Sequence, residues 1–98
     1  MKYEAKTAQA MTDRCIEKWM DEITEFLGND TTADDAIEAA IEKGATNCTF
    51  LLNMADFKCE SWIIANAMRA YFKSHEFRVD VYGHLYGNPK LFSIDLRW

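Results

Sequence analysis

Apolar and polar residues alternate along the end of the chain, from residue 77 to residue 98. Both arms of this stretch repeat with period two, which is the pattern of strands that bury one face. Gly87, Asn88 and Pro89 lie between the arms and favour a turn. We therefore predict a C-terminal β-hairpin, which needs a cover for its apolar face because an isolated hairpin is only marginally stable in water.

A four-residue loop over residues 86–89 would set the register of this hairpin. The pairs on one face would then be Phe77 with Trp98, Val79 with Leu96, Val81 with Ile94, and Gly83 with Phe92. A slip of one residue would set apolar side chains against polar ones, so the parity of the register is well determined. A shift of two residues would keep the parity, but it would place Pro89 in a tight two-residue turn. The longer loop is therefore preferred.

Residues 5–27 are predicted to form a first helix, because apolar residues recur there at steps of three and four. Gly28 and Asn29 would end it, since both residues tolerate the left-handed backbone conformation. The apolar stripe is broad enough to serve as core or as a dimer contact. Its members are Met11, Cys15, Ile16, Trp19, Met20, Ile23, Phe26 and Leu27.

Two further helices follow the same pattern. One begins at Thr31 or Thr32, whose hydroxyl can accept an unpaired amide, and it ends at Gly44. The other runs from about residue 59 to residue 74, and Trp62 lies off its buried stripe, either over the first helix or exposed. The stripe consists of Ile63, Ile64, Ala67, Met68, Tyr71 and Phe72.

Residues 46–53, between these two helices, are predicted to form a short strand. The consecutive apolar residues 50–52 indicate apolar surroundings on both faces, so we expect an inner or well-covered strand. Met54 and Phe57 follow in a connection, where they either plug the end of the core or contact a partner.

The order helix, helix, strand, helix, strand, strand predicts an α+β fold of two layers. A three-stranded sheet would carry the helices on one face and end in the C-terminal β-hairpin. Ninety-eight residues suit a single domain spanning 1–98. The helical crossover could set the first strand parallel to its neighbour, and the pattern leaves the strand order open.

Sixteen acidic and eleven basic residues give the chain a formal net charge of −5. Nucleic-acid binding depends on basic residues that displace counterions, so this balance argues against direct nucleic-acid binding. An acidic surface suits solubility, and it also suits docking on a basic protein surface. No apolar run is long enough to span a membrane, and no hydrophobic signal segment begins the chain, so we expect a cytoplasmic protein without membrane contact.

The three cysteines, Cys15, Cys48 and Cys59, lack a Cys-x-x-Cys spacing, which argues against a disulfide framework or a zinc site. Cys59 stands at a predicted helix start, where the helix dipole could lower the pKa of its thiol. No motif places a histidine beside it, and neither a P-loop nor a dinucleotide-binding glycine pattern occurs.

Asp80, Asp95 and His84 share the polar face of the hairpin and could form an acid–base or metal group. Arg78 and Arg97 lie on the same face, so its charges alternate as on a solvated sheet surface. A catalytic or metal site normally needs a pocket, which nothing in the pattern indicates. We therefore predict no catalytic residue, no metal site, no cofactor and no enzymatic activity.

Tyr82, His84 and Tyr86 gather aromatic rings near the hairpin loop. Tyrosine supplies rigid contact area with a hydrogen-bonding tip, a composition favoured at interfaces. Such a face could bind a protein partner, a second copy of the chain, or a planar small ligand between subunits.

The closing pattern of residues 90–98, Lys-Leu-Phe-Ser-Ile-Asp-Leu-Arg-Trp, resembles the ending of small phage-encoded proteins. In those proteins a helical N-terminal half leads into a strand, a helix and a hairpin that ends Leu-x-Ile-x-Trp, a layout that residues 33–98 follow. The positions that match in kind are Ile94, Leu96 and Trp98, and residues 40–44 and 46–52 match the layout before them. The chain departs at residues 74–76, where glycine and tyrosine often precede the hairpin. Most such proteins have no known function, and some small acidic ones inhibit host defence, anti-CRISPR proteins among them.

These features together predict a small acidic, non-enzymatic binding protein. The resemblance implies a phage origin and a host target, such as a CRISPR or other defence effector whose basic, nucleic-acid-binding surface is covered. The expected contact residues are Glu17, Asp21, Glu22 and Glu25, with Asp34 and Asp35 steering the approach, and Asp80, Asp95, Tyr82, His84 and Tyr86 on the hairpin. The alternative is an oligomer, for example a homodimer, that binds or sequesters a small ligand at the hairpin tyrosines.

Overall fold

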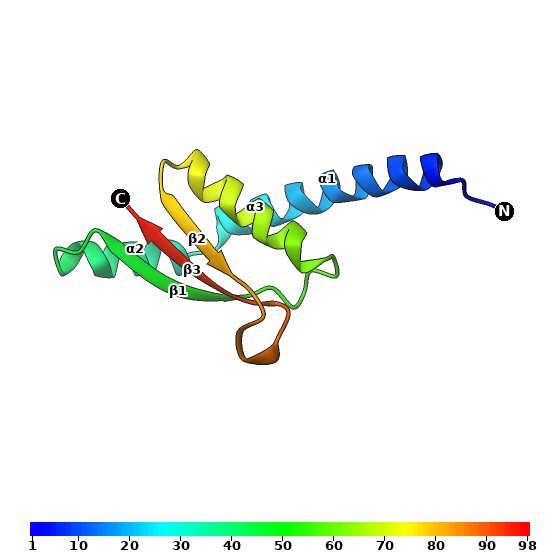
Figure 1. Ribbon diagram of the computed structural model, residues 1–98. Coiled ribbons are helices and arrows are strands. Elements are labelled where there is room, and N and C mark those ends of the chain that lie inside the picture. The colour runs from blue at the N-terminus through cyan, green and yellow to red at the C-terminus, as the bar shows by residue number, and fades with distance from the viewer.

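The computed structural model describes all residues 1–98 and contains three helices and one three-stranded sheet (Figure 1). The elements are α1 (Ala5–Asn29), α2 (Thr32–Glu42), β1 (Asn47–Asn53), α3 (Ser61–Ser74), β2 (Arg78–Tyr82), the short 3-10 helix η1 (Leu85–Gly87) and β3 (Leu91–Arg97). The predicted α+β class and the predicted element order are confirmed. None of the helices combines the length and apolar character that crossing a bilayer requires.

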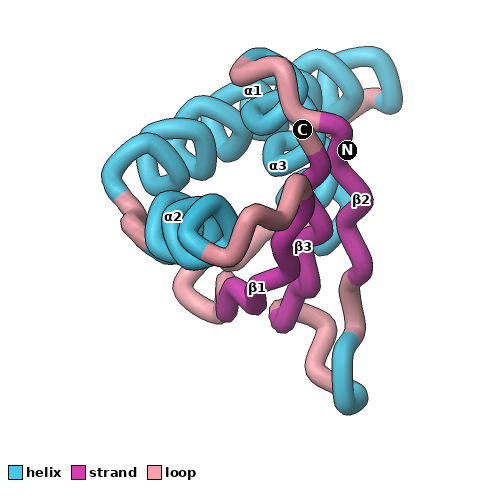
Figure 2. The backbone as a smooth tube through the Cα atoms, turned by 90° about the vertical axis from the view of Figure 1, so that its left-hand side faces the viewer, coloured by secondary structure: helices cyan, strands magenta, loops and turns pink.

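The sheet has the order β1-β3-β2, and both pairs of strands are antiparallel. The last strand therefore takes the centre, and β1 lies at an edge. The helices gather on one face of the sheet and leave the other face uncovered (Figure 2). The prediction of an inner or well-covered first strand is wrong, because Leu51 points to the uncovered face and is 49% exposed.

The predicted hairpin register is confirmed, since Val79 pairs with Leu96 and Val81 pairs with Ile94. The glycine at position 83 leaves room for Phe92: a Cβ atom there would lie 3.1 Å from a ring carbon of the buried Phe92, and the ring would have to shift. The predicted four-residue loop is too short. Ladder pairing stops at residue 82, and residues 83–90 form the connection through η1.

The end of α1 differs from the prediction. Gly28 and Asn29 do not take the left-handed conformation; both stay in the helix, and Asp30 leaves it with an extended backbone (φ −80°, ψ 138°). The predicted threonine cap of α2 is also wrong, because the Thr31 hydroxyl makes no capping bond and a carboxylate oxygen of Asp30 accepts the amide of Thr32 at 3.3 Å.

The end of α2 follows the prediction. Gly44 takes the left-handed conformation with φ +76°. The amide of Ala45 donates to the carbonyl of Ala40 at 2.9 Å, and the amide of Gly44 donates to Ile41 at 3.0 Å. These two bonds satisfy carbonyls that the last helical turn leaves unpaired.

One apolar core joins the inner face of the sheet to α3, and α1 closes it with Ile23 and Leu27. Met54 is 1% exposed, and the Phe57 ring stands edge-on to Phe26 with centroids 5.5 Å apart. These contacts favour the plug interpretation of the connection after β1. Trp62 remains 53% exposed.

The first half of α1 extends beyond this core. Figure 1 shows the helix leaving the body of the molecule, and residues 1–15 are all exposed. The radius of gyration is 15.7 Å, whereas a compact domain of this size has a value of about 13 Å. We call residues 1–15 the N-terminal arm.

Candidate functional site

Negative charge is concentrated on the second half of α1 and on α2. Nine acidic residues and one basic residue lie between positions 17 and 42, a net charge of −8. The rest of the chain has seven acidic and ten basic residues, a net charge of +3. We call the nine carboxylates the acidic helix surface: Glu17, Asp21, Glu22, Glu25, Asp30, Asp34, Asp35, Glu38 and Glu42.

These carboxylates have no cationic partner within the chain. Eight of the nine residues are exposed, and the ninth, Asp30, is half-buried and accepts only the Thr32 amide. The salt bridge of the molecule lies elsewhere, on the sheet. The acidic helix surface therefore presents its charge to solvent without internal neutralisation.

The charges on α1 are not explained by helix stability. Glu17, Asp21 and Glu25 are spaced by four residues and form one line on the helix. Like charges at this spacing destabilise a helix by roughly 0.2–0.5 kcal/mol per pair. Asp34 and Asp35 differ, because they lie in the first turn of α2, where the helix dipole favours negative charge. We call Glu17, Asp21 and Glu25 the α1 line. Helix stability does not explain why these three positions carry negative charge.

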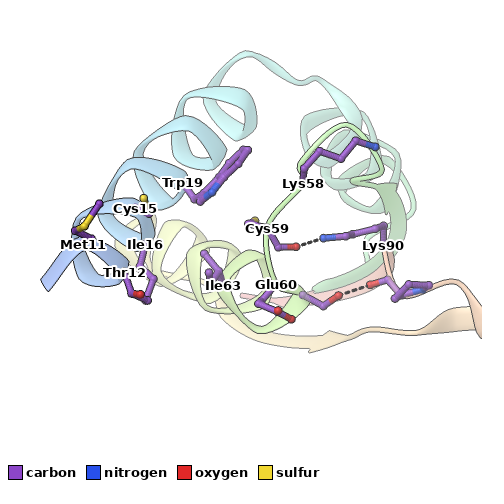
Figure 3. Close-up of a pocket in the computed structure, with 12 residues that line it drawn as sticks. Met11, Thr12, Cys15, Ile16, Trp19, Lys58, Cys59, Glu60, Ile63 and Lys90 are labelled. Atoms are coloured by element: carbon purple, nitrogen blue, oxygen red, sulfur yellow. Dashed lines mark hydrogen bonds between the residues drawn. The ribbon is translucent and has the colours of Figure 1, made fainter. Parts of the chain in front are cut away.

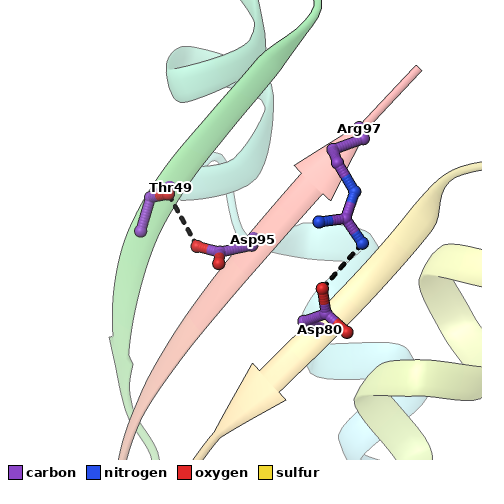
Figure 4. A network of polar contacts seen from close by, with 4 residues as sticks. All are labelled: Thr49, Asp80, Asp95 and Arg97. Carbon is purple, nitrogen blue, oxygen red and sulfur yellow. Dashed lines mark hydrogen bonds and ion pairs between the residues drawn. The ribbon is translucent and has the colours of Figure 1, made fainter.

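The uncovered face of the sheet carries the two carboxylates of the hairpin. Asp80 faces Asp95 across the ladder, and each is bound by a different neighbour (Figure 4). Arg97 contacts Asp80 at 2.7 Å, and the hydroxyl of Thr49 donates to Asp95 at 2.6 Å. The diagonal ion pair offsets part of the repulsion between like charges that face each other.

No three acidic, histidine or cysteine side chains come together in a way that could hold a metal ion. Asp80 and Asp95 do not converge with His84, which lies in the connection after β2. The arrangement supports a solvated sheet face, one of the two alternatives that the sequence offered.

The predicted aromatic residues lie at two levels of the hairpin. Tyr82 ends β2 on the uncovered face and is 53% exposed, in the same row as Leu51 and Ser93. Tyr86 lies in η1 at the protruding tip and is 93% exposed. His84 and Tyr86 both have left-handed backbone conformations, with φ 57° and φ 55°. Such conformations cost about 1–3 kcal/mol each in residues other than glycine.

A groove of about 600 Å³ opens beside α1 (Figure 3). One wall is formed by Met11, Cys15, Ile16 and Trp19, and the other by residues 58–61 and 89–90. We call this cavity the α1 groove. The sequence analysis missed it, because it joins three segments that are distant in sequence; the available signal was the apolar stripe of α1, which extends N-terminally past the core.

Two hydrogen bonds hold the second wall in place. The ammonium group of Lys90 donates to the carbonyl of Cys59, and the hydroxyl of Ser61 donates to the carbonyl of Pro89 at 2.7 Å. Both bonds tie the start of α3 to the hairpin connection. The wall is thus built by the tertiary fold and presents Lys58 and Lys90 beside the groove.

The thiols do not behave as the helix-dipole argument expects. Burial raises the pKa of the Cys59 thiol, and the nearby Lys90 lowers it by less. Burial, together with the charge of Asp95, also raises the pKa of Cys48. Both shifts disfavour the thiolate, which is the nucleophilic form.

Comparison with known proteins adds no assignment. No protein-family model, no curated protein and no solved structure matches this chain.

Proposed function

We propose that this protein is a non-enzymatic binding protein that covers a basic surface of another protein. The observation that carries the proposal is the acidic helix surface, with a net charge of −8 and no internal partner for its carboxylates. Charges arranged in this way speed association with a surface of opposite sign and make it dependent on salt.

The charge density on α1 is suited to a surface that otherwise holds nucleic acid. Residues 17–25 span about 12 Å of helix and carry four carboxylates and one lysine. A strand of DNA carries one phosphate per roughly 3.4 Å along its axis. Glu17, Asp21 and Glu25 place one carboxylate about every 6 Å along the helix axis, wider than the phosphate spacing, so they offer lysines and arginines a row of the same sign as a phosphate backbone at lower density.

The resemblance to small phage-encoded proteins narrows the partner class within this proposal. The partner would be a nucleic-acid-binding defence effector of a bacterial host, such as a CRISPR nuclease, and the two proteins would bind in the host cytoplasm. By occupying the nucleic-acid channel of the effector, this protein would inhibit the effector without any chemical step.

The test is a competition assay. A labelled DNA or guide RNA is bound to a panel of purified CRISPR nucleases, and its release by this protein is followed by fluorescence anisotropy. We expect release by the wild type, weaker release at higher salt, and loss of release in the variant Glu17→Gln/Asp21→Asn/Glu25→Gln.

The matched control removes the same number of charges elsewhere, with Asp56→Asn/Glu60→Gln/Glu76→Gln, and should compete like the wild type. All three control residues are exposed and lie outside the acidic helix surface. Equal loss in both variants would show that only net charge matters and would reject the assigned surface. Absence of competition across the panel would reject the proposed partner class.

A second candidate function is supported by the strained tip of the hairpin. Tyr86 keeps a left-handed backbone although its side chain is almost fully exposed, so packing of the ring does not compensate the strain. An oligomer that binds a planar ligand at Tyr82, His84 and Tyr86 would account for it. A thermal-shift screen with planar aromatic ligands tests this: a melting temperature that rises for the wild type but not for Tyr86→Ala supports it.

A further inference from the structure

The N-terminal arm has no cover of its own. Residues 5–15 continue α1 for three turns with every side chain exposed. In proteins most of the stability of a helix comes from packing of its apolar face, and this stretch has no such packing within the chain. A contact outside the single chain would supply that packing.

One side of the arm carries small and apolar residues at the spacing of a helix–helix seam. Ala5, Ala8, Thr12, Cys15 and Trp19 follow each other at alternating steps of three and four residues. The last three of them also line the α1 groove. The seam of the arm and the groove therefore lie on the same side of one continuous helix.

The arm cannot fill the groove of its own chain. Met11, Cys15 and Trp19 form one wall of the α1 groove, and the arm continues outward from that wall as the same helix (Figures 1 and 3). An occupant must come from another molecule. A helix of about three turns with small seam residues fits this groove, and a second copy of the chain supplies one.

We propose that two copies of this chain pair antiparallel through α1, with the arm of each copy seated in the α1 groove of the other. Such a two-fold contact is closed, because it uses the same surfaces on both partners. The antiparallel direction is what allows both arms to reach a groove at once.

The groove carries charges of both signs: Lys58, Glu60 and Lys90 line it, and Glu22 lies on the same side of α1, three residues after Trp19. Glu4 directly precedes α1 with an extended backbone, four residues before Ala8. If Ala8 of one copy packs against Trp19 of the other, Glu4 lies beyond that tryptophan, toward the end of the groove where Lys58 and Lys90 stand (Figure 3). The arm thus brings an acidic residue to an end of the groove where two lysines lie beside the carboxylates of Glu22 and Glu60.

The exposed area of the molecule also matches a dimer. The chain has 6722 Å² of accessible surface at a mass of 11.3 kDa, whereas a compact monomer of this mass exposes about 5,700 Å². The excess of about 1,000 Å² is close to the roughly 800 Å² that each partner buries in a standard interface.

The proposed pairing leaves Glu17 and Asp21 of the acidic helix surface free, whereas Glu22, three residues after Trp19, lies on the groove side. Glu17 and Asp21 are each two residues from Trp19, which places them about 200° around the helix from the groove side. A dimer would therefore present two acidic surfaces at once, and this inference does not depend on the identity of their partner.

Light scattering over a range of protein concentrations tests the pairing with two matched variants. Ala8→Arg places a large charge in the seam, whereas Ala10→Arg makes the same substitution about 200° around the same exposed helix. We expect a wild-type dimer, a dissociation constant raised roughly tenfold or more by Ala8→Arg, and no change with Ala10→Arg. Circular dichroism checks that both variants keep the fold.

A monomeric wild type at every concentration overturns the proposal, as does an equal response, or no response, of the two variants. A charge exchange tests the role of the groove. Glu4→Lys should weaken the dimer, and Glu4→Lys combined with Lys58→Glu should restore it. Failure of the double variant to regain affinity over the single one would reject the seating of the arm in the groove.

Discussion

Removing the line of charge on α1 should stabilise the fold while it abolishes binding. In Glu17→Gln/Asp21→Asn three repulsive pairs disappear, between residues 13 and 17, 17 and 21, and 21 and 25, and two attractive pairs are lost, Arg14 with Glu17 and Lys18 with Asp21. Each pair changes helix stability by roughly 0.2–0.5 kcal/mol, so the net relief of one repulsive pair should raise the free energy of unfolding by about 0.2–0.5 kcal/mol. For a domain of this size that corresponds to a melting temperature higher by roughly 1–4 °C.

A second double variant with the same charge change should have the opposite effect. Asp34 and Asp35 lie in the first turn of α2, where the helix dipole stabilises a carboxylate by roughly 0.3–1 kcal/mol. Asp34→Asn/Asp35→Asn should therefore lower the free energy of unfolding, although it relieves as much net charge as the α1 variant. All four residues are exposed, so neither variant disturbs the core.

Thermal and urea unfolding, followed by circular dichroism at low salt and at high salt, measure both effects. Added salt should shrink the difference between the two variants, since exposed charges are screened. A destabilised Glu17→Gln/Asp21→Asn protein would refute the reasoning, because it would mean that these carboxylates have a structural partner. Equal shifts in both variants would mean that net charge, and not position, governs the stability.

Three further predictions concern the core, the hairpin tip and the thiols. Met54→Ala should lower the free energy of unfolding by about 2–5 kcal/mol, because the side chain is 1% exposed and its removal leaves a cavity. Urea titration measures this loss, and a loss below about 1 kcal/mol would contradict the role of Met54 as a plug. Tyr86→Gly should raise stability by roughly 1 kcal/mol, since glycine adopts the left-handed conformation without strain, and a lower melting temperature would reveal a packing role for the ring. Folding raises the pKa values of Cys48 and Cys59 above their ordinary value of 9.0. Above pH 9 the unfolded chain therefore releases protons that the folded state still holds, and the free energy of unfolding should fall as the pH rises. Replacing both cysteines with alanine should remove that alkaline loss in a comparison of melting temperatures at neutral and alkaline pH.

Hairpin and helix predictions succeeded where one local pattern dominated. The register of β2 and β3 followed from apolar parity and from the space that Phe92 takes beside Gly83. The end of α2 followed from Gly44, whose left-handed conformation is a local property of the residue. The cap between α1 and α2 was missed, because a half-buried aspartate took the place of the threonine hydroxyl.

The candidate site was predicted only in part. The charge excess and its residues were visible in the sequence, but only the structure shows that eight of the nine carboxylates are exposed and that none of them forms an ion pair. Asp80 and Asp95 could not be assigned from the pattern alone, since each is bound by a residue from another strand. The α1 groove could not be predicted either, because segments that are distant in sequence form its walls.

The amino-acid sequence by itself determined the α+β class, the element order and the parity of the hairpin, because periods of 2 and 3.6 residues and glycine at turns act over a few neighbours. Only the tertiary structure decided that the last strand lies at the centre of the sheet, that Leu51 faces solvent, and that the arm of α1 stands clear of the core. These outcomes depend on contacts between segments far apart in the chain, where several arrangements satisfy the same local pattern and the packing of the whole core selects one.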